Sequence, residues 1–288
     1  MIRVQRTGEP QALIHARTTR LPDAVAAYEA HGAPSRVLSE LLTGYNTRAI
    51  KLTLFVDQHK KCAWCERQRD FSSSAVEHVR PKDSAWRHLP GEPRQVDAGH
   101  YWWLTWTWTN LVFACPRCND RGHKANYFPL AANTSSIPTP LRPLPSPLPP
   151  ALFDVSAEHP LLLDPAADVF LDHVRWVPSN TGQARNLWIW SPHPLTERGR
   201  ATIRILKLDE LADELQLHLV DHVLQGVTDV EQHMRGGRTR QAQDRWRAVL
   251  RLLEPDRSFT AATWCALTVW MDDARRTTWN LDPLPRPR

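Results

Sequence analysis

The sequence has no apolar run long enough to cross a bilayer and no segment with the pattern of a secretory signal peptide. These absences favour a cytoplasmic protein. Cysteine is scarce, with five in 288 residues, and a chain of this length buries enough apolar surface to fold without disulfides. In a reducing compartment, paired cysteines bind metal more often than they form disulfides. The paired cysteines are therefore predicted to be metal ligands.

Tryptophan and proline are abundant by contrast, with 13 and 24 residues. The tryptophans cluster at 102–108 and in the C-terminal third, where large aromatic residues indicate a core or an interface more than a base-stacking platform. The net charge of +5 is compatible with nucleic acid as a partner, although many enzymes without such a ligand are as basic.

The predicted fold class is α+β, and four segments follow one another along the chain. Residues 1–60 are expected to form an N-terminal extension. It begins with a basic strand and turns and ends in a helix at 47–60. Residues 61–132 carry the motifs described below. Prolines concentrated at 133–150 predict an extended linker or loop. Residues 151–288 are expected to be mainly helical and to bind a partner, with helices at 208–224, 239–253 and 258–274.

Four cysteines form two C-x-x-C pairs, Cys62 with Cys65 and Cys115 with Cys118. Two such turns supply the four thiolates of a tetrahedral structural zinc site, and two pairs in one unit favour zinc over a redox motif. A saturated four-cysteine site leaves no position for substrate. The chemistry is therefore expected in the long insert between the pairs. Cys265 lies in an apolar stretch and is predicted to be a core residue.

The insert and its flank combine a carboxylate–histidine pair with asparagines and basic residues. Glu77-His78 is followed by Pro81 after two intervening residues, Asn110 precedes Leu111, and Asn119 follows Cys118. Histidine is the natural general base near neutral pH, and carboxylate or amide oxygens bind magnesium or manganese. Adjacent residues of a regular strand point to opposite faces. Glu77 and His78 can therefore share a site only at a strand end or bend.

This order of motifs resembles the HNH nuclease family, in which a ββα-metal unit often lies between two C-x-x-C knuckles. The resemblance covers about residues 60–130. It implies His78 as the general base, Glu77 and Asn119 as ligands of a catalytic Mg²⁺ or Mn²⁺, and Asn110 as the residue that positions the histidine. Many members have aspartate at the position of Glu77 and histidine at that of Asn119.

Further residues near the motif have alternative interpretations. His123 is a rival to Asn119 as the helix ligand, or else a phosphate contact or a solvated side chain. Five basic residues are candidates for binding nucleic-acid phosphates, the alternative being a solvated charged surface. They are Arg80, Lys82, Arg117, Arg121 and Lys124.

A closer resemblance extends over most of the chain. The start MIRVQRTGEPQAL, the block YWWLTWTWTNLVFACPRCN, and the segments HKANYFPL and HPLLLDPAADVFLDHV look like the PtuB nuclease subunits of Septu and retron anti-phage systems. That resemblance implies a phage-defence role, cleavage of DNA or RNA, and a partner ATPase of the ABC/SMC-like type, PtuA. The Pro-rich stretch looks like an insertion particular to this sequence.

Two other functions remain open on the sequence. One is a non-catalytic zinc module that only binds nucleic acid or a partner, which predicts zinc without metal-dependent cleavage. The other is a stand-alone, restriction-like HNH enzyme that acts without an ATPase.

Overall fold

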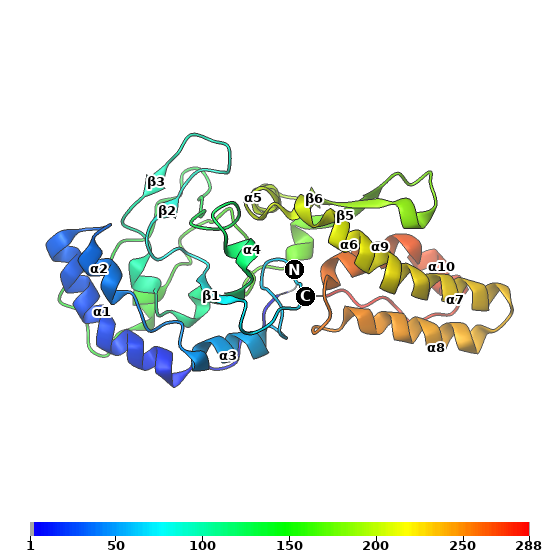
Figure 1. Cartoon of the computed structure of the whole chain (residues 1–288), viewed down its shortest axis with the longest axis horizontal. Coiled ribbons are helices and arrows are strands. Elements are labelled where there is room, and N and C mark those ends of the chain that lie inside the picture. The colour runs from blue at the N-terminus through cyan, green and yellow to red at the C-terminus, as the bar shows by residue number, and fades with distance from the viewer. Residues whose placement is uncertain (1–2, 288) are drawn as a thin grey trace.

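The chain forms two parts that lie side by side along the longest axis of the molecule (Figure 1). The computed structural model describes residues 3–287. The N-terminal part, blue to green in Figure 1, holds the motif-rich unit, and the C-terminal part holds the helices coloured yellow to red. Among the helices of residues 3–287, none is both long and apolar enough to span a membrane.

Three helices cover one side of the N-terminal part: α1 (Gln11–His31), α2 (Arg36–Leu41) and α3 (Arg48–Asp57). The predicted helix near 47–60 corresponds to α3, which begins where the Thr47 hydroxyl accepts a hydrogen bond from Ile50 N. The expectation of turns before it was wrong, because α1 and α2 together occupy most of that region. Pro22 lies inside α1 and normally disfavours a helix interior, but buried Leu21 and Val25 anchor the helix on both sides of it.

Short strands occupy the centre of this part. Strands β1 (Ala75–His78) and β4 (Leu111–Ala114) pair antiparallel, with Glu77 opposite Val112 and His78 opposite Leu111. The helical turn α4 (Pro116–Asn119) follows β4 directly. A second pair, β2 (Ala85–Trp86) and β3 (Val96–Asp97), forms a hairpin between them in sequence.

The C-terminal part is mostly helical, with one hairpin formed by β5 (Val174–Ser179) and β6 (Ile189–Pro194). The helix expected at 208–224 is the start of a longer helical stretch that includes a π-helical turn at Leu219–Leu224. The helices are α5 (Glu197–Leu206), α6 (Ala212–His218), α7 (Gln225–Arg235), α8 (Thr239–Leu250), α9 (Thr260–Trp270) and α10 (Asp273–Thr278).

The Pro-rich segment 133–150 is extended, but it packs on the N-terminal part instead of spacing the two parts. Ile137 is buried, and its N–H donates to Glu158 Oε1. Arg142 pairs with Glu29 of α1. The segment is therefore an ordered loop held by side chains that lie far away in the sequence.

The tryptophans at 102–108 belong to the core, as expected. Trp102, Trp103 and Trp106 are at most 1% exposed. The ring of Trp102 lies 5.1 Å from that of Tyr28 on α1 and 5.8 Å from that of Trp103, and Nε1 of Trp106 donates to Thr43 O. These aromatic residues therefore join the segment before β4 to the N-terminal helices. Cys265 is also buried, which agrees with its predicted core position.

Candidate metal centre and catalytic cleft

The four paired cysteines converge at one buried point. Their Sγ atoms all lie within 4.8 Å of one another, and Sγ of Cys65 is 3.9 Å from Sγ of Cys115. Tetrahedral zinc with bonds of about 2.3 Å would place sulfurs about 3.8 Å apart. The first pair follows α3, and the second begins where β4 passes into α4. The geometry therefore fits one metal ion shared by the two knuckles.

The surroundings of the sulfurs also favour a bound cation. All four cysteines are buried and none forms a disulfide. Burial raises the pKa of the Cys62 thiol, because a thiolate without a counterion is unstable away from water. Cys115 N–H donates to Sγ of Cys62 at 3.4 Å, which is a further contact suited to a thiolate. A zinc ion would keep these groups deprotonated and hold the two knuckles together.

Glu77 and His78 can share a site only at a strand end or bend, and strand β1 ends at His78. Asn110 holds the chain just beyond this end. Its Oδ1 accepts a hydrogen bond from Arg80 N at 2.7 Å, and its Nδ2 donates to Arg80 O at 3.0 Å. Asn110 therefore acts on the backbone that follows His78 and makes no direct bond to the imidazole.

The His78 imidazole is oriented by a backbone carbonyl. Its Nε2 lies 3.1 Å from Thr105 O, which can only accept, so Nε2 carries the proton. The side chain lines a cleft of about 730 Å³, and among residues 3–287 no partner is found for Nδ1. Burial, together with the charges of Lys124 and Lys82, lowers the pKa of His78 to about 3. The ring is therefore a neutral base at neutral pH, with the lone pair on Nδ1.

Tyr45, between α2 and α3, packs its ring 4.4 Å from that of His78. Burial and the neighbouring carboxylate of Glu77 raise the pKa of Tyr45 to about 12. The phenol therefore stays protonated and limits the movement of the imidazole.

Glu77 lines the same cleft and is paired with a buried lysine. Nζ of Lys124 lies 3.0 Å from Oε1 of Glu77 and also donates to the His78 carbonyl. Lys124 is fully buried, so its charge is balanced chiefly by this one carboxylate. The interaction fixes the end of β1 and leaves Oε2 of Glu77 for another ligand.

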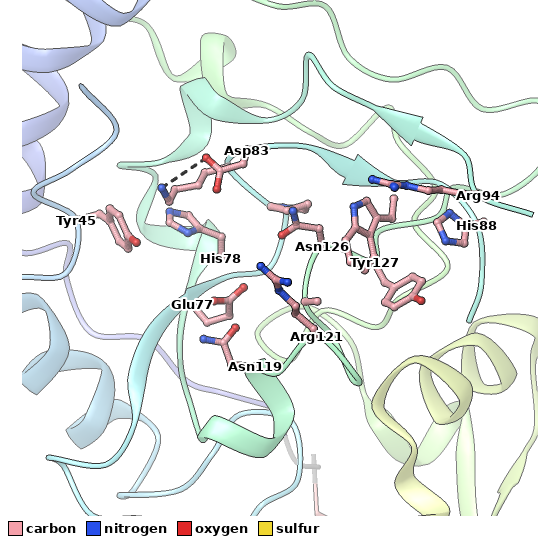
Figure 2. A pocket seen from close by; sticks show the side chains of 14 residues that line it. Tyr45, Glu77, His78, Asp83, His88, Arg94, Asn119, Arg121, Asn126 and Tyr127 are labelled. Carbon is pink, nitrogen blue, oxygen red and sulfur yellow. Dashed lines mark ion pairs between the residues drawn. The ribbon is translucent and has the colours of Figure 1, made fainter. Parts of the chain in front are cut away.

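Asn119, the last residue of α4, brings a carboxamide to the same cleft. Figure 2 shows Glu77 and Asn119 side by side, with His78 close above them. Two oxygens alone make an incomplete site for magnesium, which usually adds waters and substrate phosphates. Among the described residues, only the four cysteines form a group of three or more His, Cys, Asp or Glu side chains close enough for one ion.

The five basic residues predicted to bind phosphates divide into two groups. Lys82, which pairs with Asp83 at 3.6 Å, and Arg121 line the cleft, and their contact with phosphates stays a prediction. Arg80 is buried against Glu158, Lys124 is buried against Glu77, and Arg117 donates to Lys207 O and Glu210. The expected phosphate contacts of these three do not fit, because their side chains do not line the cleft and their cationic groups are held by these protein partners.

His123 does not line the cleft, so its interpretation as the rival metal ligand does not fit either. Helix α4 ends at Asn119, and His123 lies in the turn that follows it. Nε2 of His123 lies 3.1 Å from Glu210 Oε2 in the C-terminal part. The residue connects the two parts instead of facing the catalytic side chains.

Several lining residues escaped the sequence analysis. Tyr45 precedes the motif and has no local signal. Trp86, His88 and Arg94 come from the β2–β3 hairpin, and Asn126 and Tyr127 follow the second knuckle. The segment HKANYFPL contains the last two, but nothing in its pattern gives them a role.

The comparisons with known proteins agree with part of this picture. No protein-family model and no solved structure matches the chain. The chain is similar to the Septu protein PtuB of Bacillus mycoides (strain KBAB4), with 29% identity over 181 residues. The match covers 61% of this chain and 55% of that relative. The chain thus spans about half the length of the curated relative and resembles a Septu component of the PtuB kind.

Proposed function

We propose that this protein is a metal-dependent HNH endonuclease that hydrolyses phosphodiester bonds of DNA. The strongest support comes from His78. Its neutral imidazole donates the Nε2 proton to Thr105 O and lines the same cleft as Glu77 and Asn119. The pair β1–β4 followed by α4, next to four clustered cysteines, is the order expected of a ββα-metal unit.

The proposed reaction begins with proton transfer from water to Nδ1 of His78. The water oxygen forms a bond to phosphorus, the bond from phosphorus to the 3′-oxygen breaks, and the leaving oxygen takes a proton from solvent. Thr105 O stabilises the imidazolium that forms. A phosphate bound beside His78 adds negative charge, which raises the pKa of the ring from its low value in the free protein and strengthens it as a base.

Glu77 and Asn119 would hold a Mg²⁺ or Mn²⁺ ion. When bound, such an ion stabilises charge on the scissile phosphate and the leaving oxygen. Lys124 keeps the Glu77 carboxylate in place from behind, while Lys82 and Arg121 offer charge to the flanking phosphates. Asn110 and Tyr45 hold the end of β1 and the imidazole, so the geometry is set before substrate binds.

The test is cleavage of plasmid and linear DNA by the purified protein in Mg²⁺ or Mn²⁺. His78→Ala should lower the cleavage rate at least about a hundredfold, the usual contribution of a general base, and should leave zinc content and circular dichroism unchanged. His15→Ala is the matched control, because His15 is exposed on α1. Equal cleavage by wild type and His78→Ala would remove His78 from the mechanism. Zinc binding without cleavage by the wild type would favour the non-catalytic module.

The similarity to Septu protein PtuB supports a second part of the proposal, that the nuclease is the effector of an anti-phage complex with an ABC/SMC-like ATPase. Co-expression with an ATPase encoded beside its gene, followed by affinity purification and mass spectrometry, tests this. A stand-alone enzyme would purify without the ATPase and protect cells without it.

A further inference from the structure

Three aromatic rings form a group at one end of the cleft, away from His78. The centroid of Trp86 lies 4.8 Å from that of Tyr127, with the rings nearly perpendicular, and 6.2 Å from that of His88, with the rings nearly parallel. His88 and Tyr127 are 5.4 Å apart. All three side chains line the cleft and are only partly buried. They differ in this from the fully buried core tryptophans 102, 103 and 106.

The backbone holds these rings in place. Trp86 N donates to Asn126 O at 2.8 Å, and Phe128 N donates to Trp86 O at 2.9 Å, on either side of Tyr127. Gln95 N donates to Nδ1 of His88 at 3.1 Å. The group, which we call the aromatic platform (Trp86, His88 and Tyr127), is therefore pre-organised and not a set of mobile surface side chains.

Two arginine side chains fix the β2–β3 hairpin that carries most of the platform. Arg87 points to the opposite side from the cleft, where it donates to Tyr101, Asp97 and Phe128 O. Near the hairpin tip, Arg204 of α5 pairs with Glu92 at 2.8 Å. Both parts of the protein thus support the position of the platform.

The platform and the proposed catalytic residues are neighbours along one cleft. Figure 2 shows His78, Glu77 and Asn119 at one side, Tyr127, His88 and Arg94 at the other, and Arg121 and Asn126 between them. A nucleotide with its phosphate at His78 would direct its sugar and base, or those of the next nucleotide, towards the rings. Arg121 and Arg94 supply positive charge along that line.

We propose that the aromatic platform binds an unpaired nucleobase next to the scissile phosphate, so that the nuclease acts on single-stranded DNA or on unpaired nucleotides within a duplex. The inference rests on the proposed function. Every base has a flat π face that stacks on aromatic side chains whatever its sequence. In an intact duplex these faces are covered by neighbouring base pairs, and a base must leave the stack at a cost to reach the platform.

The test measures binding separately from cleavage. In the His78→Ala background, which keeps the substrate intact, a fluorescein-labelled oligonucleotide is titrated single-stranded and annealed to its complement, with fluorescence anisotropy as the readout. Trp86→Leu and Tyr127→Leu should each weaken single-strand binding by roughly 5- to 150-fold, the range for one base–aromatic stack. Trp86→Phe, which keeps a ring, should lose less. Trp188→Leu is the matched control, because Trp188 is a partly buried tryptophan of the C-terminal part.

Circular dichroism and zinc content show whether each variant is folded. If one of Trp86→Leu and Tyr127→Leu is not, the single-strand affinity of the other tests the inference. Single-strand binding unchanged in folded Trp86→Leu and Tyr127→Leu would overturn the inference, as would equal affinity for the single strand and the duplex. If the wild type cleaves DNA but the platform variants bind the single strand as tightly as before, the inference is wrong and the nuclease proposal stands. If the platform variants weaken single-strand binding but the wild type does not cleave, the platform binds bases and the nuclease proposal is wrong.

Discussion

At the scale of single residues, His218 couples the stability of the protein to pH. Its ring packs against His222 and Phe259, and Nε2 lies 3.0 Å from Oγ1 of Thr263. Burial, followed by the charge of His222, lowers the pKa of His218 to about 4 from an ordinary value of 6.5, while Glu66 acts in the opposite direction. Between these two pH values the unfolded chain binds more protons than the folded one. The stabilisation is therefore complete above pH 6.5 and is lost as the pH falls towards 4.

We expect His218→Gln to weaken this dependence. From pH 7 to pH 5 the wild type should lose up to about 2 kcal/mol of unfolding free energy that the variant does not lose. Urea unfolding at both pH values measures the difference between the two proteins. Any effect of protonating the four clustered cysteines is common to both proteins and cancels in that difference. Parallel losses in wild type and variant would show that His218 does not titrate as described.

The motif residues could be predicted from the sequence because their spacing carries the information. Two C-x-x-C pairs indicate thiolates that meet, and a carboxylate beside a histidine at a strand end indicates a shared site. The cationic residues could not be assigned in this way. Arg80 and Lys124 look like phosphate ligands in the sequence, but they are buried against Glu158 and Glu77. Whether a charge faces solvent or another residue depends on tertiary contacts that a local pattern does not contain.

At the scale of secondary structure, the helices with a strong apolar periodicity were predictable, and two kinds of element were not. Helix α1 contains Pro22 and a weak pattern, so its stability comes from the partners it packs against. The β2–β3 hairpin has two residues per strand, which is too short for an alternating pattern to be visible. This hairpin carries Trp86, His88 and Arg94, so its absence from the sequence-based interpretation concealed three of the 14 residues that line the cleft.

Helix α5 offers a test of how closely the elements of the C-terminal part are packed. A Cβ added at Gly199 would lie 2.0 Å from the carbonyl oxygen of His173, a backbone atom that cannot move by itself. We expect Gly199→Ala to destabilise the protein by about 2 kcal/mol, the range for overpacking, although alanine alone favours a helix. Gly182→Ala is the control, because nothing lies within 4 Å of a Cβ at that position. Thermal unfolding compares the two, and an equal or higher melting temperature for Gly199→Ala would contradict the close approach.

At the scale of the whole molecule, the first cysteine knuckle and its flank are where the two parts meet. Lys61 donates to Arg257 O at 2.9 Å, Ala261 N donates to Glu66 at 3.1 Å, and Arg67 pairs with Glu214. From the second knuckle, Arg117 donates to Lys207 O at 2.8 Å. The four cysteines thus face one another on the inside, while the residues beside them contact the C-terminal part. The position of the helices relative to the cleft depends on this junction.

Loss of the metal should therefore destabilise both parts together. A structural zinc site contributes on the order of 10 kcal/mol in binding free energy, comparable with the entire stability of a typical domain. We expect Cys65→Ser to lose zinc, measured by elemental analysis, and to unfold at a much lower temperature, with protease cleavage appearing in the C-terminal helices as well as near the cysteines. Cys265→Ala is the matched control, because Cys265 is buried in α9 and is not one of the four clustered cysteines. Intact protease resistance of the C-terminal part in zinc-free Cys65→Ser would show that the helices hold their structure without the junction, and that the metal supports only the cleft.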